Sequence, residues 1–327
     1  MELIMGEKTA QLQCTKLGGP FEVVSVPIPL IAPDQVLIRQ RVIAINLVDV
    51  KQRDHESVGS DICNLRAGDE VLAWEGSGIH GIAWGGAFQE RVVVPEAYVA
   101  KKPKNISLEE AVSLPICFVT AVCGLVHSLK IPLPFLPSLS AKGQAPSSIL
   151  ILGGSSATGA SAIQLLRIAY PSMPILATSS VKHHERMRFL GATHVFDYNS
   201  PSLIFDIRAA SPMAAGVDVI LDCVSAGASQ TKISNVFDPS GTKRYAQVIT
   251  GIPVPVPQDV QKIDVMGWSV FDMQGGKQLI PSLTRLVEEG TYQVPLPVRV
   301  IGHGLEELPN VLDEVKTVSG EKLLVTL

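Results

Sequence analysis

Residues 148–159 read SILILGGSSATG, an apolar run that ends in a glycine-rich turn. The run is hydrophobic on both faces, which is typical of a buried parallel strand. A helical pattern follows at once, because Ala160, Ile163 and Leu166 recur at helical spacing. A second short apolar run, 175–178, comes after this helix. The order of strand, glycine turn, helix and strand predicts a site for a phosphorylated nucleotide.

The turn suits a pyrophosphate for steric and electrostatic reasons. Glycines let backbone N–H groups approach the phosphates, and the positive end of the helix dipole lies behind them. Gly153, Gly154 and Thr158 are therefore candidate cofactor-binding residues. The glycine spacing is not a strict G-x-G-x-x-G, so a plain turn in an α/β protein that binds no nucleotide stays open as the alternative.

The end of the second strand indicates which nucleotide to expect. The acidic residue that grips a ribose 2′-hydroxyl usually lies about 20 residues after the glycine motif. Here Thr178, Ser179 and Ser180 occupy that position, and Lys182 follows them. Because hydroxyls and a cation suit a 2′-phosphate, the sequence favours NADPH over NADH as the cofactor.

Length and composition describe a globular chain of about two domains. It has 327 residues, of which 46% are hydrophobic, so both domains have ample core. The 27 basic and 31 acidic residues leave a net charge of −4, which gives no attraction to nucleic acid or to an anionic membrane. The first residues lack a cationic region followed by a long apolar one, so we expect a cytoplasmic protein.

One stretch, 111–129, contains no Asp, Glu, Lys or Arg and has the length of a membrane span. Ser113, Pro115 and His127 interrupt it, so a buried helix at a domain junction explains it better. We therefore expect no membrane segment.

The rest of the chain divides into two kinds of segment. Residues 1–115 look β-rich, and the middle of the chain alternates strands with helices or loops, as in a doubly wound parallel sheet. A helix over 305–317 and a last strand over 322–327 follow, and we expect that strand to pair with the N-terminal β-rich part. Further strands are expected at 35–42, 87–94, 193–196, 217–222 and 244–249. These segments predict an α/β protein.

Short motifs along nearly the whole chain occur together. They are NLVDVK at 46–51, AGDEV at 67–71, GGAFQE at 85–90, Leu114–Pro115 followed by Thr120–Ala121, the glycine turn, LGA at 190–192 and VFDY at 195–198. With them the chain resembles medium-chain dehydrogenases/reductases of the zinc-free type. It resembles more closely the fungal enoyl reductases that act in trans with polyketide synthases in secondary metabolism.

This resemblance implies the domain organisation. A GroES-like catalytic domain would comprise residues 1–115 and 287–327, and a Rossmann domain would comprise residues 116–286. Lys51 and Gly68 lie too close in sequence for the cleft-side loop and barrel strand that the family carries between them. A shortened GroES-like domain is therefore expected, with either a rebuilt, more open cleft or damaged substrate binding.

The resemblance also implies a set of cofactor-binding residues. The turn would lie along the pyrophosphate, the end of the second strand near the 2′-phosphate, and a tyrosine against the adenine. Asp222 ends a predicted central strand, where cofactors bind at a switch point, but its capping of the next turn stays open. The full set is Asn46, Gly153, Gly154, Ser155, Ser156, Ala157, Thr158, Ser179, Ser180, Lys182, Tyr198 and Asp222.

Two catalytic residues follow from the same resemblance. Thr120 would face the nicotinamide and the substrate carbonyl, and the ammonium of Lys51 would point into the cleft and stabilise an enolate. Each has a plainer alternative: a solvated lysine, and a helix hydroxyl bonded to a carbonyl one turn back. Tyr198 is likewise open to being a half-buried tyrosine without a ligand.

The chain lacks the residues of the family's zinc-dependent branch. That branch needs a cysteine ligand, a Gly-His-Glu segment, a later ligand and a four-cysteine lobe, and the sequence matches none of these motifs. The five cysteines are scattered, which fits reduced, buried thiols. We expect no metal site.

Together these features predict an NADPH-dependent oxidoreductase that reduces the C=C bond of an α,β-unsaturated carbonyl. The substrate would be a small-molecule or carrier-bound enoyl group, with a polyketide synthase as partner. Two alternatives stay open: a quinone or small-enal reductase of the same family, and an NADPH-binding, non-catalytic partner of a synthase. The sequence does not separate a monomer from a homodimer.

Overall fold

The computed structural model describes residues 7–14, 20–28, 32–46, 54–55, 64–66, 68–74, 84–139 and 143–327. The chain forms two compact units. The first comprises Met1–Pro115, Lys277–Gly290 and Pro297–Leu327, and the second comprises Ile116–Gly276 and Thr291–Leu296.

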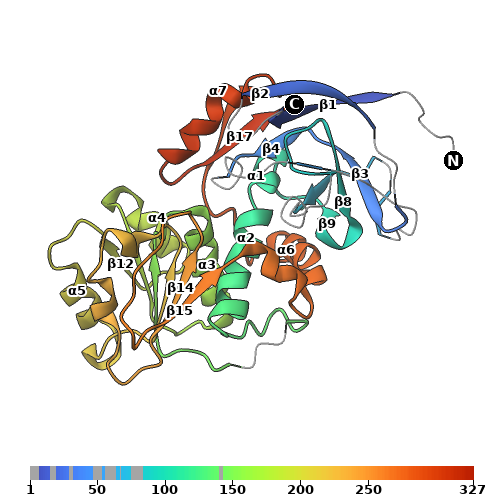
Figure 1. Cartoon of the computed structure of the whole chain (residues 1–327). Helices are drawn as coiled ribbons and strands as arrows, with labels where there is room; N and C mark the ends of the chain where they lie inside the picture. Colours follow the sequence, from blue (N-terminus) through green and yellow to red (C-terminus); the bar gives the residue numbers. More distant parts are fainter. Residues whose placement is uncertain are drawn as a thin grey trace. The chain divides into compact units, whose positions relative to one another are not determined.

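The second unit is built on a six-stranded sheet with the order β12-β11-β10-β13-β14-β15, all parallel (Figure 1). The order reverses at β10, with the earlier crossovers on one side and the later ones on the other, which defines a switch point. The strands are β10 (Ile149–Leu152), β11 (Ile175–Ser179), β12 (His194–Asp197), β13 (Val219–Asp222), β14 (Arg244–Val248) and β15 (Gln261–Val265). The predicted doubly wound parallel sheet is confirmed.

Burial explains why this sheet forms from these residues. Every residue of β10, β11 and β13 is buried, as expected for strands that are covered on both faces. One core cluster joins Leu150, Ile220 and Tyr245 of the sheet to Leu203 and Ile207 of helix α5. The helices of this unit are α2 (Pro115–Val122), which starts at the unit boundary, α3 (Ala157–Ala169), α4 (His184–Phe189) and α5 (Leu203–Ala210).

The apolar stretch noted in the sequence forms α1 (Leu108–Val112), α2 and a π-helical segment, Cys123–Ser128. The segment Leu108–Ser128 is long and apolar enough to cross a membrane, with a mean hydropathy of 1.8. However, 78% of its most apolar window is buried inside the protein. Such burial is typical of a core helix.

The first unit consists of small sheets. β17 (Lys322–Thr326) lies between β16 (Val298–His303), to which it is parallel, and β4 (Val42–Ala44), to which it is antiparallel. The predicted pairing of the last strand with the N-terminal part is therefore confirmed. Four antiparallel pairs complete the described strands: β1 (Lys8–Cys14) with β2 (Phe21–Pro27), β3 (Gln35–Arg39) with β8 (Arg91–Pro95), β5 (Asp54–His55) with β7 (Trp84–Gly85), and β6 (Val71–Ala73) with β9 (Val99–Lys101).

Three expectations for this unit have different outcomes. The helix expected over 305–317 is shorter: α7 (Leu308–Val311) continues only as a 3-10 turn, Leu312–Lys316.

Helix α6 (Leu279–Glu288) packs against β9, and Thr284 Oγ1 donates to Lys101 O at 2.9 Å. The contacts therefore place it in the first unit, whereas the sequence-based boundary at 286 divides it. Most of the shortened stretch between Lys51 and Gly68 lies outside the described residues.

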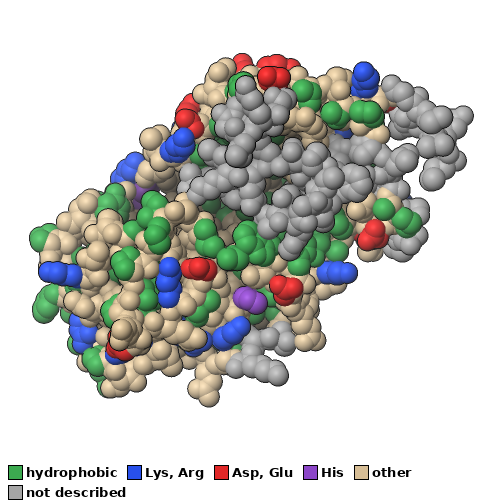
Figure 2. Space-filling view, viewed as in Figure 1, with side chains coloured by type: hydrophobic (Ala, Val, Ile, Leu, Met, Phe, Trp, Pro, Cys, Tyr) green, Lys and Arg blue, Asp and Glu red, His purple; other side chains and the backbone are tan. Residues whose placement is uncertain are grey.

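Charges on the surface are mixed. Figure 2 shows that the described Lys and Arg side chains on this face are scattered and interspersed with Asp and Glu. A stripe of basic side chains, such as a nucleic-acid-binding protein carries, is absent from the described part of this face.

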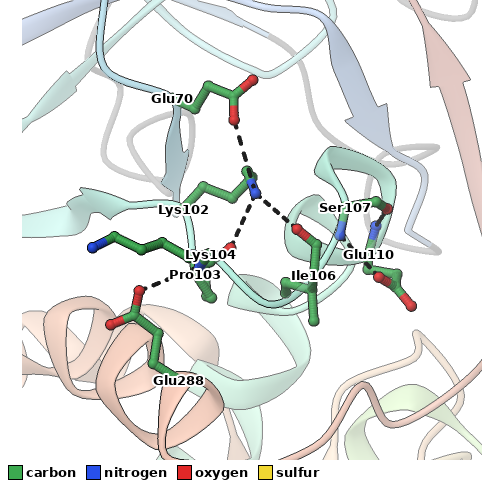
Figure 3. Close-up of polar contacts among 8 residues, drawn as sticks. All are labelled: Glu70, Lys102, Pro103, Lys104, Ile106, Ser107, Glu110 and Glu288. Carbon is green, nitrogen blue, oxygen red and sulfur yellow. Dashed lines mark hydrogen bonds and ion pairs between the residues drawn. The ribbon is translucent and has the colours of Figure 1, made fainter.

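A polar network leads the chain into α1 (Figure 3). Lys102 Nζ donates to Pro103 O at 3.0 Å and to Ile106 O at 2.7 Å, and it lies 3.8 Å from Glu70 Oε2. Ser107 and Glu110 then form a capping box: Glu110 N donates to Ser107 Oγ at 3.1 Å, and Ser107 N donates to Glu110 Oε2 at 2.9 Å. The lysine therefore satisfies carbonyls that the turn leaves unpaired.

We predict that Lys102→Met lowers the free energy of unfolding by about 2 kcal/mol, because two carbonyls lose a charged donor. Lys101→Met is the matched control. The Lys101 side chain is 53% exposed and pairs with Asp69 at the surface, whereas the Lys102 side chain is 11% exposed. The control should change stability by about 0.5 kcal/mol or less. Denaturant unfolding of both variants measures this, and equal effects would contradict the assigned role of Lys102.

Candidate functional site

The glycine turn lies at the carboxyl end of β10, the switch point of the sheet. Gly153 N donates to Thr178 Oγ1 at 3.2 Å, and Gly154 N donates to Thr178 O at 2.8 Å. These bonds tie the turn to the end of the neighbouring strand β11. Gly153 has a φ of +73°, in the left-handed region that favours glycine.

The turn has no room for a side chain at two of its glycines. A Cβ at Gly153 would lie 2.6 Å from Val224 Cγ1. A Cβ at Gly159 would lie 2.3 Å from Gly153 O and 3.0 Å from Gly154 Cα. The first turn of α3 therefore packs directly on the backbone of the glycine turn.

Helix α3 begins at this turn. Ser156 is its N-cap, and the Ser156 hydroxyl accepts from Gly159 N at 3.1 Å. Ser155, Ala157 and Thr158 lie beside the cap and are partly exposed. The predicted pyrophosphate residues are therefore brought together at the N-terminus of a 13-residue helix, where its dipole favours an anion.

The predicted 2′-phosphate residues at the end of β11 differ in their exposure to solvent. Ser179 is buried, and its hydroxyl donates to Ser180 O at 3.1 Å. Ser180 is partly exposed, and Lys182 is exposed in the 3-10 turn Val181–His183. His184 Nε2 lies 3.3 Å from Ser179 O. Ser180 and Lys182 are thus the members of this group that face solvent.

Tyr198 follows β12 and is 45% exposed. It lines a hollow of about 280 Å³ between residues 198–204 and residues 229–233. Gln230 Nε2 donates to Tyr198 O at 3.0 Å, which ties the two segments together. The tyrosine ring therefore lines an open hollow.

Asp222 has a different place from the other predicted contacts, because its carboxylate is fully buried and bonded within the unit. Oδ1 accepts from Val224 N at 3.1 Å and Ala226 N at 3.0 Å. Oδ2 accepts from Gly227 N at 3.0 Å and from the Tyr245 hydroxyl at 2.5 Å. The structure therefore shows the alternative reading, in which Asp222 caps the next turn.

Sequence reasoning missed the partners of this turn on β14. Burial and the neighbouring Asp222 carboxylate raise the pKa of Tyr245, so its hydroxyl stays protonated as a donor. Gln247 Nε2 donates to Ser225 Oγ at 2.8 Å and to Ile252 O at 2.6 Å. The available signal was the alternation of Tyr245 and Gln247, which places both on one face of a buried strand.

The remaining predicted residues lie elsewhere. Thr120 in α2 is partly exposed. Asn46 in the first unit accepts a hydrogen bond from Lys322 Nζ at its Oδ1, and its Nδ2 donates to Ala44 O at 3.1 Å. Lys51 lies outside the described residues.

In the described ranges, no group of three His, Cys, Asp or Glu side chains converges to form a metal-binding site. Cys117, Cys123 and Cys223 are buried thiols that are not paired in disulfides. Burial raises the pKa of the Cys123 thiol to about 12, so it remains protonated and unreactive.

Comparisons with curated proteins show the family of the chain, and comparisons with solved structures show its fold. No protein-family model matches the chain. Trans-enoyl reductase caaB of Aspergillus niger is 30% identical over 91% of each chain, and trans-enoyl reductase fsa3 of a Fusarium species is 30% identical over 92% of this chain and 93% of its own. The crystal structure of CurK enoyl reductase shares the fold, with a TM-score of 0.74 and 21% identity over 98% of this chain and 99% of that one. The chain belongs to the family of fungal trans-enoyl reductases.

Proposed function

We propose that the protein is an NADPH-dependent enoyl reductase that reduces the C=C bond of an α,β-unsaturated carbonyl of the polyketide type. The observation that carries this proposal is the glycine turn at the switch point of the sheet, in a chain of the trans-enoyl reductase family. The substrate is a small-molecule or carrier-bound enoyl group, and a polyketide synthase is the proposed partner.

The described residues fit a dinucleotide. The missing Cβ atoms at Gly153 and Gly159 let the turn close tightly, so that backbone N–H groups and the N-terminus of α3 are available to a pyrophosphate. Lys182 and Ser180 are both accessible, which supports the proposal that they bind a 2′-phosphate. Tyr198, exposed beside its hollow, offers a ring face to the adenine.

NADPH, if held by these residues, would supply the hydride that adds to the β-carbon of the substrate. The chain's task is to hold the substrate carbonyl and to stabilise the negative charge that develops on its oxygen. We assign this to the Thr120 hydroxyl and to the Lys51 ammonium. The α-carbon then takes a proton from Lys51 or from water, which completes the addition of two hydrogens across the double bond.

The test is a titration of the purified protein with NADPH and with NADH by nucleotide fluorescence, followed by addition of a simple enone. We expect tight NADPH binding and loss of NADPH absorbance on addition of the enone. Oxidation of NADPH only in the presence of quinones or small enals would instead identify the protein as a quinone or small-enal reductase. Binding without any oxidation would support a non-catalytic partner of a synthase, and failure to bind either nucleotide would contradict the proposal.

Cofactor choice has its own prediction. Lys182→Ala should weaken NADPH binding roughly 10-fold or more and leave NADH binding nearly unchanged, because only NADPH carries the phosphate that a cation contacts. Arg188→Ala is the control, since Arg188 is an exposed cation further along α4. Dissociation constants from nucleotide fluorescence measure this. Equal losses for the two nucleotides would exclude Lys182 as a 2′-phosphate ligand.

A further inference from the structure

Two loops at the carboxyl edge of the six-stranded sheet are joined by a buried glutamine. They are the loop after β13 (223–228) and the loop after β14 (249–254), both within the second unit. Gln247 of β14 is 3% exposed. Its Nε2 donates to Ser225 Oγ at 2.8 Å and to Ile252 O at 2.6 Å, so one amide reaches both loops.

The Gln247 amide is used at both ends. Its oxygen accepts from Val254 N at 3.3 Å, and its NH₂ group makes the two bonds given above. Ser225 Oγ and Thr250 Oγ1 lie 2.5 Å apart, which adds a second hydrogen bond between the loops. Because a buried amide without partners costs free energy, separation of the loops is unfavourable.

The backbone of the loop after β13 also shows that this loop is held in one conformation. Ser225 has a φ of 55°, and such strain persists only where the surroundings impose it. The bonds from Gln247 and Thr250 hold the Ser225 side chain. Asp222 accepts from the N–H groups of the residues on either side of Ser225.

The place of the two loops on the sheet indicates which part of the cofactor lies over them. A dinucleotide lies across the switch point, with its two halves on opposite sides. Ser180, Lys182 and Tyr198, which are proposed for the 2′-phosphate and the adenine, follow β11 and β12 on one side of β10. The nicotinamide half then extends over β13 and β14 on the other side, and so over the two loops.

The two loops carry exposed apolar side chains. Val224 is 44% exposed, Ile249 is 46% exposed and Ile252 is 56% exposed. Val224 also lies against Gly153 of the glycine turn, so the loop after β13 adjoins the proposed pyrophosphate site. Ligand sites are lined mainly by apolar side chains, which suit the flat nicotinamide ring.

We propose that Gln247 is a positioning residue that joins the two loops, so that Val224, Ile249 and Ile252 together support the nicotinamide half of NADPH. This rests on the proposed function, because it takes the glycine turn as the pyrophosphate site. A support that is fixed before the cofactor binds holds the ring ready for hydride transfer. Loss of the Gln247 amide would leave the adenosine half bound and the nicotinamide half loosely held.

The test measures the two halves of the cofactor separately, with reduced nicotinamide mononucleotide for one half and 2′,5′-ADP for the other. In Gln247→Leu we expect the affinity for the mononucleotide to fall about 10-fold and that for 2′,5′-ADP to change less than about twofold. Gln261→Leu is the matched control, because Gln261 is an exposed glutamine at the start of β15. It should leave both affinities unchanged. Equal losses for the two fragments in Gln247→Leu, or an unchanged affinity for the mononucleotide, would overturn the proposal.

Thr250 offers a second comparison, because its hydroxyl can be removed with little change of shape. Thr250→Val loses the bond to Ser225 and should lower the affinity for the mononucleotide about threefold, whereas Thr250→Ser keeps a hydroxyl and should restore it. A loss in Thr250→Ser as large as that in Thr250→Val would contradict the bond between the loops as the cause.

The intact cofactor gives a further readout. With saturating NADPH, quenching of the nicotinamide fluorescence by iodide should rise in Gln247→Leu and stay at the wild-type level in Gln261→Leu. Failure of the wild-type protein to bind NADPH would contradict the proposed function and this proposal with it. Normal NADPH binding with the same quenching in the wild type and in Gln247→Leu would overturn the role of Gln247 alone.

Discussion

Gly159→Ala should reduce the affinity for NADPH by about 100-fold or more. The added Cβ would lie 2.3 Å from Gly153 O and 3.0 Å from Gly154 Cα, both of them backbone atoms. The glycine turn or the first turn of α3 must therefore move, and both form the proposed pyrophosphate site. Overpacking of this kind typically costs about 1–3 kcal/mol, so the unfolding free energy should fall as well.

The matched control for this substitution is Gly241→Ala in the same unit. There the nearest atom to a new Cβ is a side-chain oxygen, Asp218 Oδ1 at 3.2 Å, and the backbone has no positive φ. Its NADPH affinity should equal that of the wild type. Fluorescence titration and denaturant unfolding of both variants measure the difference, and wild-type affinity in Gly159→Ala would exclude the turn as the nucleotide site.

The parallel sheet and glycine turn of the second unit were predictable because the sequence patterns that specify them are local. The strand, the glycine turn and α3 follow one another along the chain, and their periodicity and turn chemistry are read directly from consecutive residues. The same holds for the end of β11, where the sequence correctly places the hydroxyl-bearing residues. It did not show that Ser179 points inward while Ser180 faces solvent, since that depends on how the strand end leaves the sheet.

The rest depends on pairings between distant segments. The role of Asp222 is set by Tyr245, which the strand register brings close on β14. The sequence predicted Lys322 only as the start of a last strand. Its hydrogen bond to Asn46 was not predicted, because the two residues lie far apart in the chain. The unit to which α6 belongs follows from its packing on β9, which its own amphipathic pattern does not specify.

Asp222→Ala should lower the free energy of unfolding by about 3–5 kcal/mol, because it leaves three backbone N–H groups and a buried hydroxyl without their acceptor. The carboxylate also holds a turn in which Ser225 adopts a left-handed φ of 55°, a conformation that is strained for a residue other than glycine. Tyr245→Phe removes one of the four donors and keeps the ring, so it should cost about 1–2 kcal/mol.

Asp238→Ala serves as the control, since Asp238 Oδ1 accepts from Ser240 N at 2.8 Å in an exposed turn. Its loss should cost about 1 kcal/mol or less. Chemical denaturation of the three variants ranks them, with Asp222→Ala the most damaging. The turn that Asp222 holds also carries Val224, whose side chain lies against Gly153 of the glycine turn. NADPH affinity should therefore fall in Asp222→Ala under conditions where the protein remains folded, and an unchanged affinity would show that the turn after β13 does not support the nucleotide site.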